Sequence, residues 1–133
     1  MKLVDNVMKG DFLQDVHGNI GFVYKIDEAI HIQLLNDGPD VQSVHDLISP
    51  VKLTKDFLKK NMYCDLSTPP DYKEYSYEDD DPDGVGIYVR AYNDGTFYAE
   101  ATDKTGSFSK DIQYVHELQH IFKEFNVQMD WVL

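Results

Sequence analysis

The sequence predicts an α+β fold in which short strands come first and two helices are separated by a β-hairpin. Three observations predict it: short alternating runs with turn residues in 9–50, a hairpin pattern in 86–102, and helical spacing of apolar residues in 109–125. The chain has 133 residues, of which 42% are hydrophobic. That is enough to bury one compact core or two small lobes that share a core.

The first fifty residues predict a small β-barrel, residues 1–50, ahead of a second region, 51–133. Four or five short strands in so few residues bury a core only by curling. Glycine, asparagine and aspartate turns separate these strands, which we expect at 10–13, 20–26, 30–34 and 41–48. Gly10-Asp11-Phe12-Leu13, a glycine turn and then Gly21-Phe22-Val23-Tyr24-Lys25-Ile26 resemble the G-D-x-V…G-x-V-x-x-I run of SH3-like barrels, including the KOW type.

The second region predicts a short helix over 55–61 with Thr54 as its N-cap, followed by a strand over 72–77. A hairpin is expected over 86–92 and 96–102, because Asn93-Asp94-Gly95 tolerates positive φ. One side of its first strand would carry Ile87, Val89 and Ala91, and the other Tyr88, Arg90 and Tyr92. The tyrosine side is either a binding surface or cross-strand packing.

A longer helix is predicted over 109–125, packed on the sheet, because its apolar residues recur at three- and four-residue steps. Ser109 would be its N-cap, and Asn126 would stop it in a left-handed conformation. On this helical wheel His116, Glu117 and His120 lie opposite the apolar stripe. The alternating tail 127–133 is expected to add a strand to its own sheet, or to offer one to a partner.

The same helix contains His116-Glu117-Leu118-Gln119-His120, which matches the H-E-x-x-H pattern of zinc hydrolases. In this alternative reading His116 and His120 bind zinc and Glu117 is the general base. A third ligand is needed, for which Asp130 is the candidate in the tail and His31 or His45 the candidates upstream. Without a complete set of ligands, the preferred interpretation is a protein without a cofactor that is not an enzyme.

The net charge is −12, and it favours a partner protein with a basic surface. It argues against direct nucleic-acid binding, unless four lysines form a local basic face on a nucleic-acid-binding barrel: Lys52, Lys55, Lys59 and Lys60. The candidate binding residues are the acidic cluster Glu78, Asp79, Asp80, Asp81 and Asp83. A lone cysteine and the absence of a secretory signal pattern or a membrane-spanning apolar run predict a cytoplasmic protein.

Two further segments carry a second resemblance. Residues 49–58, with Pro50-Val51-Lys52-Leu53-Thr54, and residues 114–119, with Tyr114-Val115-His116-Glu117-Leu118-Gln119, are similar to small uncharacterised proteins of Bacteroidetes phages and prophages. That group has a "P-I-x-L-T-x-x-W-L" helix start and a "Y-V-H-x-L-Q-N" helix. The resemblance implies a mobile-element origin. With the acidity, it leads to the hypothesis of a non-enzymatic inhibitor of a host defence protein that handles nucleic acid, of the anti-CRISPR or anti-restriction type.

Overall fold

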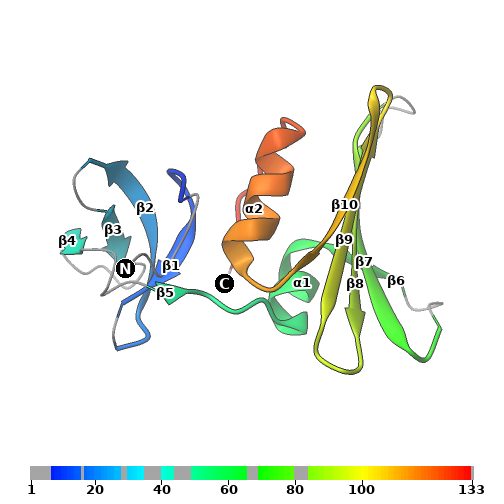
Figure 1. Ribbon diagram of the computed structural model, residues 1–133, viewed down its shortest axis with the longest axis horizontal. Helices are drawn as coiled ribbons and strands as arrows, with labels where there is room; N and C mark the ends of the chain where they lie inside the picture. The colour runs from blue at the N-terminus through cyan, green and yellow to red at the C-terminus, as the bar shows by residue number, and fades with distance from the viewer. Residues whose placement is uncertain are drawn as a thin grey trace. The chain divides into compact units, whose positions relative to one another are not determined.

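A computed structural model describes residues 7–15, 17–27, 30–34, 40–43, 49–65, 69–79 and 84–132. The chain divides into two compact units. Unit 1 contains Met1–Lys52 and Tyr114–His120, and unit 2 contains Leu53–Gln113 and Ile121–Leu133. Each unit has a five-stranded antiparallel sheet (Figure 1). The described residues form two antiparallel sheets and two helices, which agrees with the predicted α+β class.

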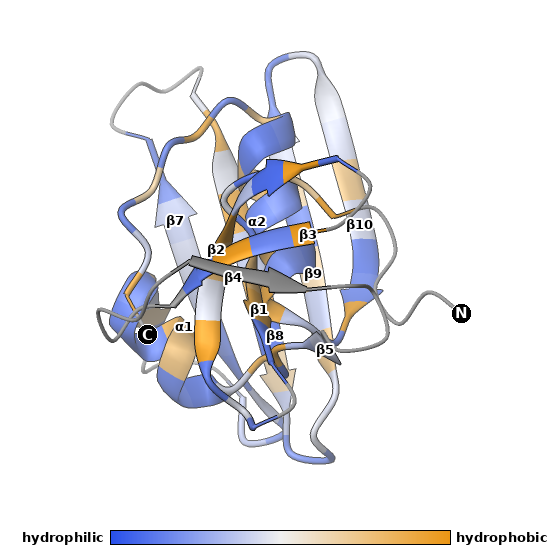
Figure 2. Cartoon of the chain, turned by 90° about the vertical axis from the view of Figure 1, so that its left-hand side faces the viewer, coloured by the Kyte–Doolittle hydropathy of each residue, from blue (hydrophilic) through white to orange (hydrophobic). Residues whose placement is uncertain are grey.

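Unit 1 is built on a sheet with the order β4-β3-β2-β1-β5. Its strands are β1 (Phe12–Gln14), β2 (Ile20–Ile26), β3 (Ile30–Leu34), β4 (Asp40–Ser43) and β5 (Ser49–Pro50). Hydrophobic and hydrophilic residues alternate along β3 (Figure 2), and in β2 Val23 lies opposite Ile32 of β3, so these strands share one apolar face. The core of that face is formed by Leu13, Val23, Ile30 and Ile32.

The strands predicted in the first fifty residues are confirmed for β1, β2 and β3. Gly18 has a φ of +80°, so the turn predicted at 17–19 uses a glycine where other residues would be strained. The turn predicted at 36–39 and the end of the 41–48 strand, beyond Ser43, lie outside the described residues. The strands that are described form an open sheet, so the SH3-like barrel stays a prediction.

Unit 2 is built on a longer sheet with the order β10-β9-β8-β7-β6. Its strands are β6 (Tyr63–Asp65), β7 (Tyr72–Glu78), β8 (Gly86–Tyr92), β9 (Phe97–Asp103) and β10 (Gly106–Ile112). The predicted hairpin and the strand before it are therefore confirmed. Ile87, Val89 and Ala91 are fully buried on one face, while Tyr88, Arg90 and Tyr92 are half-exposed on the other, as their alternation predicts.

Two helices contribute to the core of unit 2. The first, α1 (Lys55–Asn61), begins and ends as predicted, and the Thr54 hydroxyl accepts a hydrogen bond from the Phe57 amide at 3.1 Å. The second, α2 (Val115–Glu124), ends in unit 2, where Phe122 meets Tyr77 of β7 edge to face at 5.6 Å between ring centres. Both helical segments therefore bury aromatic or aliphatic side chains in unit 2.

The start predicted for the long helix was wrong. Residues 109–112 belong to strand β10, where Ser109 pairs with Glu100 and Ile112 with Phe97 of β9. Ile112 is buried at the end of that strand, which explains why its apolar side chain fitted the helical pattern as well. The predicted end was correct: Asn126 has a φ of +61°, and the Val127 amide donates to the Phe122 carbonyl, as in a Schellman cap.

The tail was expected to form a strand, and residues 127–132 do not form one. The apolar residues of the tail serve packing and not strand pairing. Trp131 is the residue that holds the tail to unit 2. The indole stacks on Phe57 of α1 at 5.8 Å and meets Phe122 of α2 edge to face at 4.8 Å. The Asn61 side chain exchanges two hydrogen bonds with the backbone of Val132. Side-chain packing therefore fixes the tail in place of sheet pairing.

Candidate functional site

The H-E-x-x-H segment lies in the first turns of α2, and its glutamate caps the helix. The Glu117 carboxylate accepts a hydrogen bond from the Tyr114 amide at 3.0 Å. Tyr114 immediately precedes the helix, so this contact is the reciprocal half of a capping box. Tyr114 has no side-chain oxygen near its own backbone to complete the box, so no capping-box pattern in the sequence indicates this role.

On the helical wheel the two histidines lie opposite the apolar stripe, which predicts that they face solvent, and that prediction was wrong. His116 is buried, with 6% of its surface exposed, and it stacks on Tyr114. His120 is half-buried and its Nε2 lies 2.6 Å from a carboxylate oxygen of Asp11, a residue that is itself buried. The two imidazole rings meet edge to face at 5.5 Å between centres. Unit 1 therefore uses the polar side of this helix as an internal contact surface.

Gln119 makes the contact between α2 and β1 specific. Its side-chain carbonyl accepts from the Phe12 amide at 2.8 Å, and its amide group donates to the Gly10 carbonyl at 3.0 Å. The Asp11 carboxylate also accepts from the Met8 amide at 2.8 Å. These bonds satisfy buried backbone groups at the start of the sheet. No sequence pattern could have indicated the two bonds of Gln119, since Gln119 lies more than a hundred residues from Phe12 and Gly10.

These contacts give Glu117, Gln119 and both histidines of the motif a structural role in unit 1. Asp130, the proposed third zinc ligand, is exposed in the tail and belongs to unit 2. His31 contacts Asp27 at 3.1 Å, and His45 lies outside the described residues. Among the described ranges, no group of three or more His, Cys, Asp or Glu residues has the geometry of a metal site.

Purified protein dialysed without chelator is expected to contain far less than one zinc per chain. The reason is that the Nε2 atom of His120, which a zinc site of this motif would use, already contacts Asp11. Inductively coupled plasma mass spectrometry measures the metal directly. About one zinc per chain, lost in both His116→Ala and His120→Ala, would contradict this structural role. Glu117 would then be the residue to test for catalysis.

The acidic cluster predicted to bind a partner is described only in part. Glu78 is the last residue of β7, and Asp79 follows it on the surface. Asp80, Asp81 and Asp83 lie outside the described residues. Glu78 does not stand alone, because its side chain shares one face of the β6–β10 sheet with further carboxylates.

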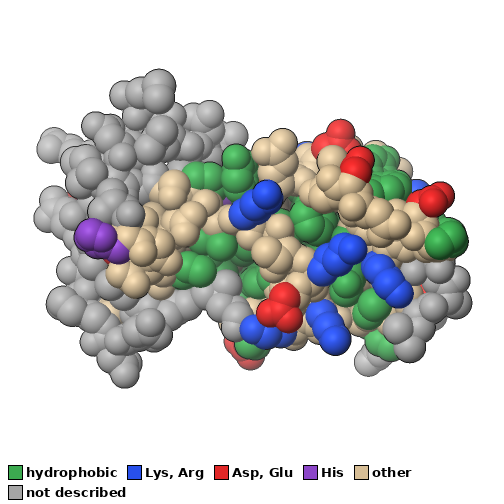
Figure 3. Space-filling model, turned by 90° about the horizontal axis from the view of Figure 1, so that it is seen from below, with side chains coloured by type: hydrophobic (Ala, Val, Ile, Leu, Met, Phe, Trp, Pro, Cys, Tyr) green, Lys and Arg blue, Asp and Glu red, His purple; other side chains and the backbone are tan. Residues whose placement is uncertain are grey.

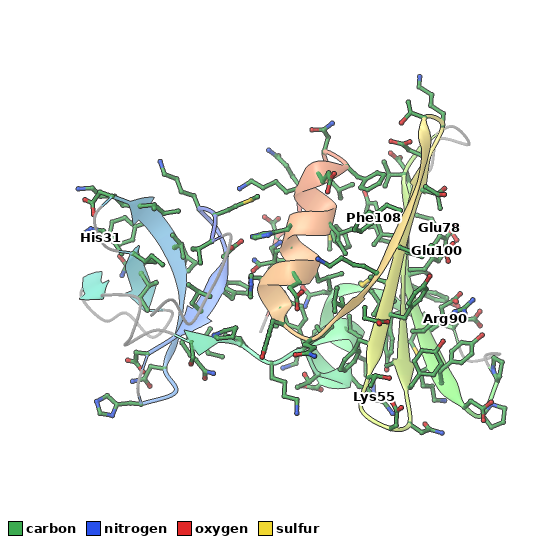
Figure 4. The ribbon with its side chains drawn as sticks, viewed as in Figure 1. His31, Lys55, Glu78, Arg90, Glu100 and Phe108 are labelled. Carbon is green, nitrogen blue, oxygen red and sulfur yellow. The ribbon has the colours of Figure 1, made fainter. Side chains whose placement is uncertain are left out.

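We call this surface the outer face. It is the side opposite Ile87, Val89 and Ala91, and Figure 4 shows Glu78, Arg90 and Glu100 on it, with Phe108 on the other side of the sheet. Strand register gives it tyrosines at Tyr63, Tyr72, Tyr88, Tyr92 and Tyr98, and carboxylates at Asp65, Glu74, Glu78, Glu100 and Asp111. Arg90 is the one basic residue among the described strand positions of this face. The outer face is therefore aromatic and acidic together.

Arg90 occupies a defined place on the outer face. Its guanidinium lies over the ring of Tyr72 at 5.0 Å from the ring centre, and its Nε lies 3.4 Å from a carboxylate oxygen of Glu74. A hydrogen bond with Tyr92 and the neighbouring Tyr72 and Glu74 raise the pKa of Arg90, against the effect of burial. This sheet thus holds a guanidinium between an aromatic ring and a carboxylate.

Tyr88 lies at the centre of the outer face. Its hydroxyl donates to the Glu78 carboxylate at 3.2 Å. Partial burial, that hydrogen bond and the charges of Glu78, Glu74 and Glu100 raise the pKa of Tyr88 above its usual value near 10. Gly86 allows this arrangement, because a Cβ there would come within 2.8 Å of the Tyr88 hydroxyl. The phenol therefore stays protonated at neutral pH in a negative surrounding.

Next to Tyr88 the outer face is hollowed into an open pocket of about 350 Å³. Strands β6, β7 and β8 supply its lining, which consists of Tyr63, Asp65, Glu74, Ser76, Glu78 and Tyr88. Among the described residues that line it, none is a lysine or an arginine. Tyr63 is strongly exposed, with 73% of its surface accessible, so its ring is available to a ligand. Of these residues, Glu78 belongs to the predicted acidic cluster, and Tyr88 lies on the hairpin side for which a binding surface was one of two predicted alternatives.

The lysines of the alternative nucleic-acid reading lie mainly on α1. Lys55, Lys59 and Lys60 are exposed there, and Lys60 pairs with Asp56 at 3.2 Å. Figure 3 shows Lys and Arg side chains, with acidic ones nearby, on the surface seen from below. Lys52 belongs to unit 1. A short helix with an internal ion pair is the usual solvated arrangement of such charges.

Comparison with known proteins gives this chain no relative: no family model, no curated protein and no solved structure matches it. None of the described helices has the length and apolar character that crossing a membrane would require. Function is therefore inferred from the outer face and its pocket.

Proposed function

We propose that this protein is a non-enzymatic binding protein that engages a basic surface of a partner protein through the outer face. The observation that carries the proposal is the composition of that face, in which tyrosines and carboxylates alternate around one arginine. Tyrosine contributes large contact area at low entropic cost, and a carboxylate field attracts a basic partner. The net charge of −12 is also negative, so it adds long-range attraction to the same basic partner.

The face also has the form of an interface. No described element of unit 2 lies over it, because α1 and the end of α2 contribute to the core on the side of Ile87, Val89 and Ala91. Its tyrosines and carboxylates are held by cross-strand contacts such as that of Tyr72 with Tyr92, whose ring centres are 5.3 Å apart. A rigid, preorganised surface loses little entropy on binding.

We extend the proposal to the biological setting. Segments 49–58 and 114–119 resemble phage and prophage proteins, so the partner would be a host protein of the cytoplasm that handles nucleic acid. Restriction and CRISPR effectors present basic, phosphate-binding surfaces of the required charge. We also propose that unit 1 is an open relative of SH3-like barrels, which is supported by β5 lying beside β1 in the sheet.

Neutralising the outer face is expected to abolish partner binding. The test variant is Glu74→Gln with Glu78→Gln and Glu100→Gln, and the control is Asp56→Asn with Glu124→Gln and Asp130→Asn, which changes the charge equally on other surfaces. Loss of three interfacial carboxylates should weaken binding at least about a hundredfold. Proteins captured from host lysate are identified by mass spectrometry, with and without competing duplex DNA.

The expected result is a captured protein that binds the wild type and the control variant, does not bind the outer-face variant, and is displaced by the DNA. Capture that is unchanged by the outer-face variant, or that DNA does not displace, would refute the proposal. The glutamine replacements preserve side-chain shape, and circular dichroism of both variants checks that the fold is intact.

A further inference from the structure

We infer that the pocket lined by Tyr63, Asp65, Glu74, Ser76, Glu78 and Tyr88 receives an arginine side chain of the partner. This inference rests on the proposed function and specifies the residue that the outer face recognises. The group that binds in the pocket is then a guanidinium, and a partner protein supplies it.

An arginine of this chain already binds the outer face in the way that we infer for the partner's arginine. Arg90 lies over the Tyr72 ring and against the Glu74 carboxylate on the same face. The pocket repeats this combination on the neighbouring strands, since tyrosine rings from β6 and β8 stand beside carboxylates from β6 and β7. The difference is that the described lining of the pocket contains no basic side chain. A guanidinium supplied from outside would find the same two kinds of contact.

Size and charge agree with this ligand. A pocket of about 350 Å³ is large enough for the planar head and part of the stem of one arginine. Asp65, Glu74 and Glu78 give it a negative lining that a single Arg90 at its margin offsets only in part. Partial burial and the surrounding carboxylates also raise the pKa of Tyr88, consistent with a site that favours a cation.

Geometry favours arginine over lysine. A planar guanidinium can stack on Tyr63 or Tyr88 and donate parallel hydrogen bonds to a carboxylate, whereas an ammonium group makes only point contacts. Glu78 is oriented for this by the Tyr88 hydroxyl, which binds one of its oxygens. Gly86 in turn leaves the space that Tyr88 needs.

The test is a nuclear magnetic resonance titration of the full chain with the blocked peptide acetyl-Gly-Arg-Gly-amide. The control peptides carry citrulline or lysine in place of arginine, and citrulline keeps the shape without the charge. The amides of Tyr63, Asp65, Ser76 and Tyr88 should shift in a saturable manner with the arginine peptide. Its affinity should exceed that of the citrulline peptide about tenfold, the effect of one charge-assisted contact.

Variants locate the binding. Asp65→Asn with Glu78→Gln should reduce the affinity about tenfold or more, whereas Asp111→Asn, on the same face but outside the pocket, should leave it within about twofold. Gly86→Ala keeps every charge and displaces the Tyr88 ring, so a loss of affinity in this variant would assign part of the binding to the aromatic contact.

Equal affinity for the arginine and citrulline peptides, or shifts at other residues, would overturn the inference. Equal affinity for the lysine peptide would overturn the choice of guanidinium. If the peptide fails to bind while the outer-face variant still loses its captured partner, the pocket inference is wrong and the proposed function stands. If the peptide binds the pocket and no partner depends on the outer face, the proposed function is wrong and the pocket stands.

Discussion

Asp11→Ala is expected to lower the free energy of unfolding of unit 1 by about 3 kcal/mol. Asp11 is buried, and its carboxylate serves two partners, the His120 ring at 2.6 Å and the Met8 amide at 2.8 Å. Removing it leaves the His120 ring and the Met8 amide without their acceptor, at a position where Asp11 itself is buried. Such losses cost more than the bond itself contributed, because the remaining donors stay desolvated.

The effect is measured by urea unfolding followed through amide exchange of Leu13, Val23 and Ile32, which report on unit 1. Asp130→Ala, an exposed carboxylate in the tail, is the control and should change the stability by less than about 0.5 kcal/mol. An Asp11→Ala protein as stable as that control would show that the contact with His120 contributes nothing to the fold.

Trp131→Ala is expected to cost unit 2 about 3 kcal/mol and to release the tail. The indole packs between Phe57 and Phe122, joining the tail to both helical segments of that unit. It is half-buried, so we place the effect at the lower end for loss of a large aromatic side chain. Trp131→Phe should keep the ring contacts and recover more than half of the stability.

Thermal unfolding by circular dichroism gives the stabilities, and proteolysis reports on the tail. Rapid cleavage within residues 127–132 is expected for Trp131→Ala and not for Trp131→Phe. If the alanine variant melts with the wild type and its tail resists the protease, the aromatic cluster does not hold the tail.

Where the structure agrees with the sequence prediction, the determining signal is local. Thr54 caps α1 through a contact three residues away, and the hairpin turn at Asn93-Asp94-Gly95 has a φ of +92° at its glycine. Asn126 stops α2 because it, like Gly95, adopts a positive φ. Such signals depend on backbone conformation that a few residues decide, so one sequence is enough to read them.

Where prediction failed, partners distant in sequence decide. Ile112 fitted a helical stripe, and only its pairing with Phe97 makes it part of a strand. His120 lay on the polar side of the helical wheel, and its contact with Asp11, 109 residues away, could not be seen there. The outer face was partly visible in the alternation of Tyr88, Arg90 and Tyr92, but the pocket needs β6 and β7 beside them. Strand order is a property of the whole chain.

The hydrogen bond between Phe12 and Gln119 joins residues 107 positions apart. A ribosome makes the first strands of unit 1 long before it makes the helix that completes them. At about 5–20 residues per second, β1 to β5 would wait several seconds for Gln119. During that interval the Phe12 amide and the Gly10 carbonyl lack their final partner. Strands β6 to β10 of unit 2 follow one another directly in the chain, so their sheet can form before α2 is made. The sheet of unit 1 is completed only afterwards, when Gln119 of α2 becomes available.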